Sequence, residues 1–303
     1  MPGEGNSGLY AMVLLLGAAS ASTAPRTGGH LAHAAFLQMV REIDADLSAR
    51  LHAPAQTARP FTVSALEGVK RPGGGAAGLE PGDDCWLRVT AMESDIVQAL
   101  MARLREAGGR SDMWLGPARL LVREALVTSG SHPWAGYTTW QQLLDGARPA
   151  AELTLQFASP TAFGFGQRSW GKKCVVLPEP ELVFGSLLRS WRAFSPVQLP
   201  VDAEALQACL QNDVIITRIE GLRTQMLRYT KAPQIGFVGR VTYGLKGTDE
   251  GCRRALNALA DFAFYAGVGM KTAMGMGQCR RLPDSSARGA PASPPAPRPM
   301  SGG

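Results

Sequence analysis

The sequence predicts an α+β protein made of two tandem βαββαβ units, followed by a tail without regular structure. Three observations support this prediction. Short apolar runs alternate with amphipathic segments, and this order of elements occurs twice along the chain. The chain has 303 residues, which is enough for two domains of ordinary size. Apolar residues make up 45% of the composition, so each unit can bury a core.

The first unit begins with an apolar run over 9–16, which we interpret as a buried strand. The run is unlike a signal peptide, because the only charge before it is Glu4 and the positive n-region is missing. It is also too short to span a bilayer, so we expect no membrane association.

An amphipathic helix is predicted next, because apolar side chains recur at spacings of three or four residues: Phe36, Val40, Ile43, Leu47 and Leu51. Pro54 is expected to end this helix, and the Pro-Gly-Gly-Gly stretch near 72–75 to form a turn. The other elements of the unit are expected as strands over 60–66, 85–91 and 119–128 and a helix over 94–106. This order is that of the ferredoxin-like (RRM-like) fold.

The second unit repeats the order. Strands are predicted over 151–158, 173–177, 213–220, 234–245 and 272–282, and helices from Pro180 to before Pro196 and over 249–265. Thr248 is expected to cap the last helix. The domains are therefore expected over 1–145 and 146–282, and the tail 283–303, rich in Pro, Ala, Ser and Gly, is expected to be disordered.

A glycine-rich loop separates the last helix from the last strand. Residues 267–277 hold one lysine, Lys271, among four glycines, namely Gly267, Gly269, Gly275 and Gly277. Exposed N–H groups in such a loop can cradle a phosphate, and the lysine adds charge. Dinucleotide-binding loops precede a helix, and nucleotide-triphosphate loops contain Gly-Lys-Ser/Thr, so the sequence excludes both.

Charge and cysteines narrow the class of protein. The net charge is +6, and 231–282 holds eight basic residues against three acidic ones, which weakly indicates an acidic partner such as nucleic acid. Arg253 and Arg254 have a simpler explanation as a solvated helix face. The five cysteines are scattered without a CxxC pair, which argues against structural zinc and fits a reducing cytoplasm.

Several ordered blocks resemble a known family: 236–244 followed by 265–277, Leu51-His52 followed by 60–64, 159–163, and 177–184. They are similar to the CRISPR-associated endoribonucleases of the repeat-processing (Cas-six) type, in the RAMP superfamily. The resemblance implies two ferredoxin-like domains and cleavage of precursor CRISPR RNA within its repeats. In this chemistry a 2′-hydroxyl attacks the adjacent phosphate without metal or cofactor and leaves 2′,3′-cyclic phosphate and 5′-hydroxyl ends.

The resemblance also implies repeat RNA, as precursor and as mature CRISPR RNA, as the partner in the cytoplasm. Effector-complex subunits and a second copy of the chain are further partners that it leaves open. Two alternatives stay open as well. In the first, the chain is a subunit of a CRISPR effector complex that holds repeat RNA without cutting it. In the second, it is an unrelated RNA-binding protein with tandem ferredoxin-like domains.

The implied chemistry needs a base, an acid and a cation, and histidine suits proton transfer near neutral pH. His52 is the first candidate, because it lies off the apolar stripe at a helix end that favours imidazolium, and it matches a family histidine. His33 is second, although its place near the stripe also fits a structural histidine. Arg59 lies where some relatives carry lysine and can stabilise charge without acting as a base. The tyrosine that some relatives carry on the first helix is missing.

His30 is expected to be exposed, and His132 to be structural or peripheral. For RNA binding we expect the four loop glycines with Lys271, Arg240 and Arg280. Phe163 or Phe165 is a candidate for stacking on an unpaired base, and packing in the core is the competing interpretation for both.

Overall fold

The computed structural model describes residues 8–23, 28–53, 58–69, 78–106, 111–169, 171–229 and 233–283. The turn expected near 72–75 and the tail expected beyond Pro283 lie outside these residues. Within them, no helix is long and apolar enough to cross a membrane.

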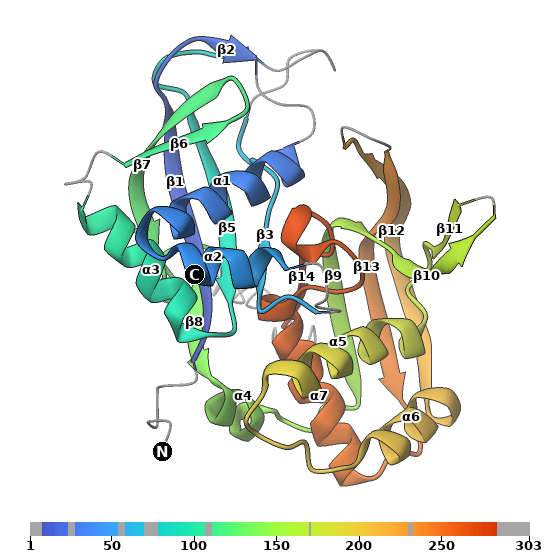
Figure 1. Ribbon diagram of the computed structural model, residues 1–303. Helices are drawn as coiled ribbons and strands as arrows, with labels where there is room; N and C mark the ends of the chain where they lie inside the picture. The colour runs from blue at the N-terminus through green and yellow to red at the C-terminus, as the bar shows by residue number, and fades with distance from the viewer. Residues whose placement is uncertain are drawn as a thin grey trace, which may run out of the picture.

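The N-terminal domain is an antiparallel sheet with helices on one face (Figure 1). Its central strands are β1 (Gly8–Ala18) and β5 (Asp84–Ala91), flanked by β3 (Phe61–Val63) and β7 (Ala118–Leu126), with β6 (Ser111–Leu115) beyond β7. β8 (Gly136–Thr139) extends the β7 side of β1, and β2 (Ser22–Thr23) pairs with β4 (Gly78–Leu79). Alternate residues of β1, such as Met12 and Leu14, are buried in the core under the helices. The strand order β3-β5-β1-β7 confirms the ferredoxin-like prediction.

The single helix expected up to Pro54 is two helices, α1 (Gly28–Ile43) and α2 (Ala45–His52). Asp44 breaks the helix because its backbone is extended and its side chain accepts a hydrogen bond from the Leu47 amide at 2.8 Å. The apolar spacing continues across the break because Leu47 and Leu51 enter the same core as α1. Pro54 lies outside the described residues. α3 (Ser94–Glu106) has the predicted bounds.

The C-terminal domain repeats the arrangement, with the strand order β12-β13-β9-β14. These strands are β9 (Glu152–Thr161), β12 (Val214–Leu227), β13 (Gln234–Leu245) and β14 (Cys279–Arg281). α5 (Pro180–Phe194) and α7 (Glu250–Ala266) cover one face, and α6 (Ala203–Asn212) packs beside them (Figure 1). α4 (Trp140–Gly146) joins the domains, and its Trp140 is buried in the C-terminal core.

Several details of this domain differ from the prediction. The strand expected over 173–177 is β11 (Gly171–Val175), which pairs only with β10 (Phe163–Arg168) in a separate hairpin. The last helix is capped by Asp249, whose side chain accepts from the Cys252 amide at 2.7 Å, and not by Thr248. The strand expected over 272–282 is mostly loop, with a 3₁₀ turn at Thr272–Met274 before β14.

A candidate active site between the two domains

The glycine loop 267–277 lies between the two domains and is hydrogen-bonded to both. On the C-terminal side, the Met270 amide donates to the Ala162 carbonyl at 2.9 Å, and the Gly269 amide donates to Ser186 Oγ at 2.8 Å. On the N-terminal side, the Gly275 amide donates to the Val63 carbonyl at 2.8 Å. The loop therefore connects α5 and β9 of one domain to β3 of the other.

The glycines allow the loop to pack against protein, which differs from the predicted cradle of exposed amides. Gly267, Gly269, Gly275 and Gly277 all have positive φ, and three of the four are buried. A Cβ at Gly269 would lie 2.4 Å from the Ala162 carbonyl oxygen, and one at Gly277 would lie 2.2 Å from the Val268 carbonyl oxygen. The close approach that requires glycine is thus an approach to the chain itself. Lys271, with φ 56°, is the exposed side chain of the loop.

His33 is buried where α1 meets the glycine loop. Its Nδ1 lies 3.0 Å from the Ala273 carbonyl oxygen, and its ring stacks on Phe61 with centroids 5.7 Å apart. A carbonyl oxygen can only accept, so Nδ1 carries the hydrogen and Nε2 is left as an acceptor. Burial lowers the pKa of His33 to about 4, and the nearby positive charge of Arg59 acts in the same direction. His33 is therefore neutral near pH 7.

His52 is exposed at the end of α2, with its ring centroid 6.4 Å from that of His33. The carbonyls at this helix end already have donors. Arg59 donates to the carbonyls of Leu51 and His52, and the Ala53 amide donates to that of Arg50. The helix thus has caps other than the His52 ring. The fold brings together His33, His52 and Arg59, the three residues that the sequence singled out for catalysis.

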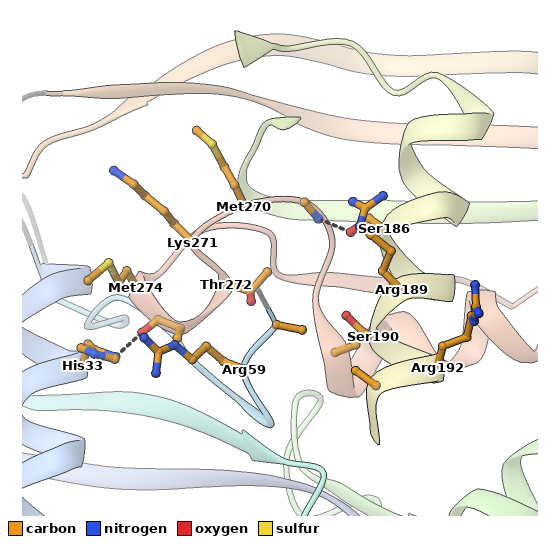
Figure 2. Close-up of a pocket in the computed structure, with 15 residues that line it drawn as sticks. His33, Arg59, Ser186, Arg189, Ser190, Arg192, Met270, Lys271, Thr272 and Met274 are labelled. Atoms are coloured by element: carbon orange, nitrogen blue, oxygen red, sulfur yellow. Dashed lines mark hydrogen bonds between the residues drawn. The ribbon is translucent and has the colours of Figure 1, made fainter. Parts of the chain in front are cut away.

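A cavity of about 710 Å³ opens beside this cluster and is lined by His33 and Arg59, whereas His52 is not among its lining residues (Figure 2). His33 and Arg59 lie on one side of the glycine loop, and Ser186, Arg189 and Arg192 of α5 lie on the other. Both α5 arginines are exposed, and neither forms an ion pair with another described residue. The sequence analysis missed these cations, although arginines three residues apart beside Ser186 place the three side chains on neighbouring turns of one helix.

Tyr229, which follows β12, also approaches the loop and was missed. Its hydroxyl donates to the Met274 carbonyl at 2.8 Å, and burial raises its pKa. Lys271 Nζ lies 4.6 Å from the centre of the Tyr229 ring, a distance typical of a cation–π contact. His30 is half-buried, with its ring 6.1 Å from that of Tyr229. The loop lysine therefore extends over an aromatic ring that also supports the loop backbone.

Other predicted residues lie elsewhere. Arg240 of β13 and Arg280 of β14 lie on the sheet face away from α5 and α7, on either side of Gln156 in the intervening strand β9. Arg280 Nε donates to Gln156 Oε1 at 2.8 Å. Neither arginine lines the cavity with His33. The fold thus separates these two cations from Lys271.

The remaining aromatic and histidine candidates differ in exposure. Phe163 is buried beside Phe237, whereas Phe165 is 40% exposed and lines a hollow that shares Arg189 and Gly269 with the main cavity. His132 accepts a hydrogen bond from the Trp134 amide at 3.1 Å, outside the cavity. In the part of the chain described, no three or more His, Cys, Asp or Glu side chains are grouped to hold a metal ion.

Comparison with known proteins identifies the family. The model of the CRISPR Cas6 N-terminal domain matches residues 9–145, and the model of the CRISPR-associated endoribonuclease Cas6 matches residues 155–279. A solved Cas6 (TTHA0078) product complex is 31% identical, with a TM-score of 0.71, and the match covers 91% of this chain and all of that one. The chain belongs to the Cas6 family.

Two further relatives agree. A product complex of Thermus thermophilus Cas6 (TTHB231) is 27% identical, with a TM-score of 0.76, over 90% of this Cas6 chain and all of that chain. The curated Cas6 endoribonuclease of Streptococcus thermophilus is 27% identical over 125 residues, which is 41% of this chain and 48% of the relative. That match therefore spans about half the length of the curated relative.

Proposed function

We propose that this Cas6 protein is a metal-independent endoribonuclease that cleaves precursor CRISPR RNA within its repeats. The 2′-hydroxyl attacks the adjacent phosphorus, the P–O5′ bond breaks, and the products carry 2′,3′-cyclic phosphate and 5′-hydroxyl ends. The observation that carries the proposal is the junction of the domains, where two histidines 6.4 Å apart and Arg59 lie beside the cavity that Lys271 lines. Solved complexes of Cas6 relatives with product and with a substrate mimic support the proposal.

His33 is assigned as the base that receives the 2′-hydroxyl proton. It is neutral at working pH, and its Nδ1–H is held by the Ala273 carbonyl, so Nε2 presents a lone pair. Its pKa of about 4 is low for a base in the free protein. A phosphate anion bound in the cavity raises this pKa by stabilising the imidazolium, and thus strengthens the base when substrate is present.

His52 is assigned as the acid that protonates the leaving 5′-oxygen. It is exposed at the end of α2, so its ring is accessible to a bound RNA and to solvent. The 6.4 Å between the ring centroids leaves room for one phosphate group between the two histidines. In this proposal the base and the acid act on opposite sides of the same phosphorus atom.

Arg59 and Lys271 are the cations expected to stabilise the phosphorane charge. Arg59 has five N–H donors, and its two hydrogen bonds to the end of α2 use one donor on Nη1 and one on Nη2. The remaining donors are therefore available to phosphate. Lys271 also lines the cavity, and its side chain extends from the loop on the side away from Arg59 (Figure 2). Preorganised cations of this kind stabilise developing charge without reorganising during the reaction. The loop glycines contribute by fixing the position of this lysine.

The RNA path is proposed to continue along α5. Arg189 and Arg192 can contact phosphates on one side of the cut, and the exposed ring of Phe165 can stack on an unpaired base. Arg240 and Arg280 are proposed to contact a different segment of the repeat, because they lie on the open face of the sheet.

The test is cleavage of the cognate repeat RNA in excess EDTA, with the product ends analysed. We expect a shorter product with a 2′,3′-cyclic phosphate and an unchanged rate relative to buffer with Mg²⁺. A requirement for added metal would contradict the mechanism. Tight binding without any cleavage would instead favour the alternative of a subunit that holds repeat RNA.

A further inference from the structure

Arg88 is a buried cation at the contact between the two domains. It lies in β5, on the sheet face opposite the core of α1 and α3, and it is only 2% exposed. No carboxylate among the described residues pairs with it, and burial lowers its pKa to about 9. Because a buried charge is costly unless it is well hydrogen-bonded, its partners indicate why it is there.

Those partners belong to segments far from β5 in the chain. Arg88 Nε donates to the Trp134 carbonyl at 2.9 Å, and Nη2 donates to the Phe264 carbonyl. The guanidinium carbon lies 5.2 Å from the Trp134 ring centre and 4.4 Å from that of Phe264, and the two rings are parallel to within 1°. Arg280 covers Trp134 at 4.6 Å. Arg88 is thus held by two carbonyls and two aromatic rings.

One of these hydrogen bonds caps the last turn of α7, the helix that leads into the glycine loop. A helix leaves its last four carbonyls without partners inside the helix. At the end of α7, the Phe264 carbonyl accepts from Arg88, and the Tyr265 carbonyl accepts from Thr90 Oγ1 at 2.6 Å. Both donors come from β5 of the other domain. The N-terminal sheet therefore caps α7, and the positive charge lies at the favourable end of the helix dipole.

The same sheet holds the far half of the loop. The Gly275 amide donates to the Val63 carbonyl in β3, which pairs with β5, and the Ala273 carbonyl faces His33 Nδ1 at 3.0 Å. The end of α7, where the loop begins, is thus fixed by β5, and the far half of the loop is fixed by β3 and α1. A shift of α7 along β5 would move the Ala273 carbonyl away from His33.

We infer that Arg88 is a positioning residue that holds the end of α7 on the N-terminal sheet and thereby keeps the glycine loop against His33. The inference rests on the proposed function in one respect, since it takes His33 and the loop as parts of the active site. Arg88 itself is buried and acts through the loop.

The test compares Arg88→Met and Arg88→Lys with the parent chain. Methionine fills similar space without charge or donors, and lysine keeps the charge but loses the planar fork that donates to the two carbonyls. We expect both variants to lower the single-turnover rate at saturating RNA by about 10²-fold, as for a misplaced reacting group, while the Kd for RNA changes less than about threefold. Arg123→Met, at an exposed ion pair with Asp84, is the matched control and should change neither quantity.

A second readout does not depend on cleavage. We expect faster hydrogen exchange in 267–277 of Arg88→Met and loss of the His33 Nδ1–H tautomer by NMR, with exchange in α3 unchanged. A normal rate in the folded variant would overturn the inference, and so would a slow rate with unchanged loop exchange and tautomer. If Arg88→Met does not fold, the same comparison is made with Arg88→Lys. If the parent chain does not cleave RNA, the proposed function fails, and the exchange measurement still decides the role of Arg88.

Discussion

The two domains carry an arginine on the equivalent strand and face, and the two arginines differ in environment. Arg88 of β5 and Arg240 of β13 both lie on the third strand of a βαββαβ unit, on the face away from the helices. Arg88 is 2% exposed because α7 and Trp134 cover that face in the N-terminal domain. Arg240 is exposed and forms an ion pair with Glu220 at 3.7 Å. The covered sheet face makes Arg88 a link between the domains, as inferred above. The open sheet face leaves Arg240 available to the proposed RNA ligand.

The same contrast divides the proposed chemistry. The N-terminal domain supplies the titratable groups His33 and His52 with Arg59, whereas the C-terminal domain supplies Lys271 and the α5 arginines. Variants of His33, His52 and Arg59 should therefore lower the rate, variants of the α5 arginines should weaken binding, and Lys271→Ala should do both. The following predictions test this division, from the largest expected effect to the smallest.

The largest effect is expected at the two histidines. His33→Ala and His52→Ala should each slow single-turnover cleavage by about 10²-fold or more, because each removes a proton-transfer group. RNA affinity, measured by filter binding, should be nearly unchanged. His132→Ala, outside the cavity, is the control. A variant that cleaves at the parent rate would eliminate that histidine from the mechanism.

Substitutions of the two phenylalanines of β10, Phe163 and Phe165, should affect different quantities, one the stability and the other RNA binding. Phe163→Ala should lower the free energy of unfolding by roughly 3–5 kcal/mol, because its ring is buried in the core. Phe165→Ala should leave stability nearly unchanged and weaken RNA binding by about 1–3 kcal/mol through lost base stacking. Urea denaturation and RNA titration measure the two quantities. Equal affinities of Phe165→Ala and the parent chain would remove the stacking role.

Lys271 and Arg240 test whether RNA contacts both the cavity and the open face of the C-terminal sheet. Each alanine variant should reduce the slope of log K against log salt by about 0.7, the value for one single-strand phosphate contact. Lys271→Ala should also slow cleavage, because its charge lies at the cavity, whereas Arg240→Ala should leave the rate at saturating RNA unchanged. An unaltered slope for either variant would exclude a phosphate contact at that position.

A further effect is expected in the pH dependence of stability. The pKa of His33 is about 4 in the folded chain and 6.5 as its ordinary value, so between these pH values the unfolded chain binds more protons. Stability should therefore fall as pH drops from about 6.5 to about 4. His33→Gln should remove this part of the decline in thermal unfolding measured at pH 7 and pH 5. The same decline in the variant would assign it to other groups.

The sequence located most of the elements and much of the candidate site, because these depend on local patterns. Apolar periodicity predicted α3 and the helix that ends at His52, and the two prolines Pro180 and Pro196 marked the ends of α5. The break at Asp44 was missed because the spacing of apolar residues continues through it. The hairpin of β10 and β11 and the short α6 gave weak signals beside the longer elements.

What the sequence could not show depends on contacts between distant segments. The glycines of the loop were predicted to face a ligand, whereas they pack against Ala162 and Val268. Tyr229 and Arg88 act through carbonyls more than 40 positions away in the chain, and no local pattern predicts such partners. The sequence therefore predicted which residue types form the candidate site, whereas the contacts that arrange them became known only from the fold.

The most direct test of the account is cleavage of a repeat RNA that carries a single 2′-deoxynucleotide at the cut position, in excess EDTA. We predict that this RNA binds with the affinity of the all-ribose RNA and is not cut at that position, because the attacking hydroxyl is missing. Cleavage of the deoxy-substituted RNA at the same bond would show that water or another group is the nucleophile. That result would contradict the roles assigned to His33 and His52.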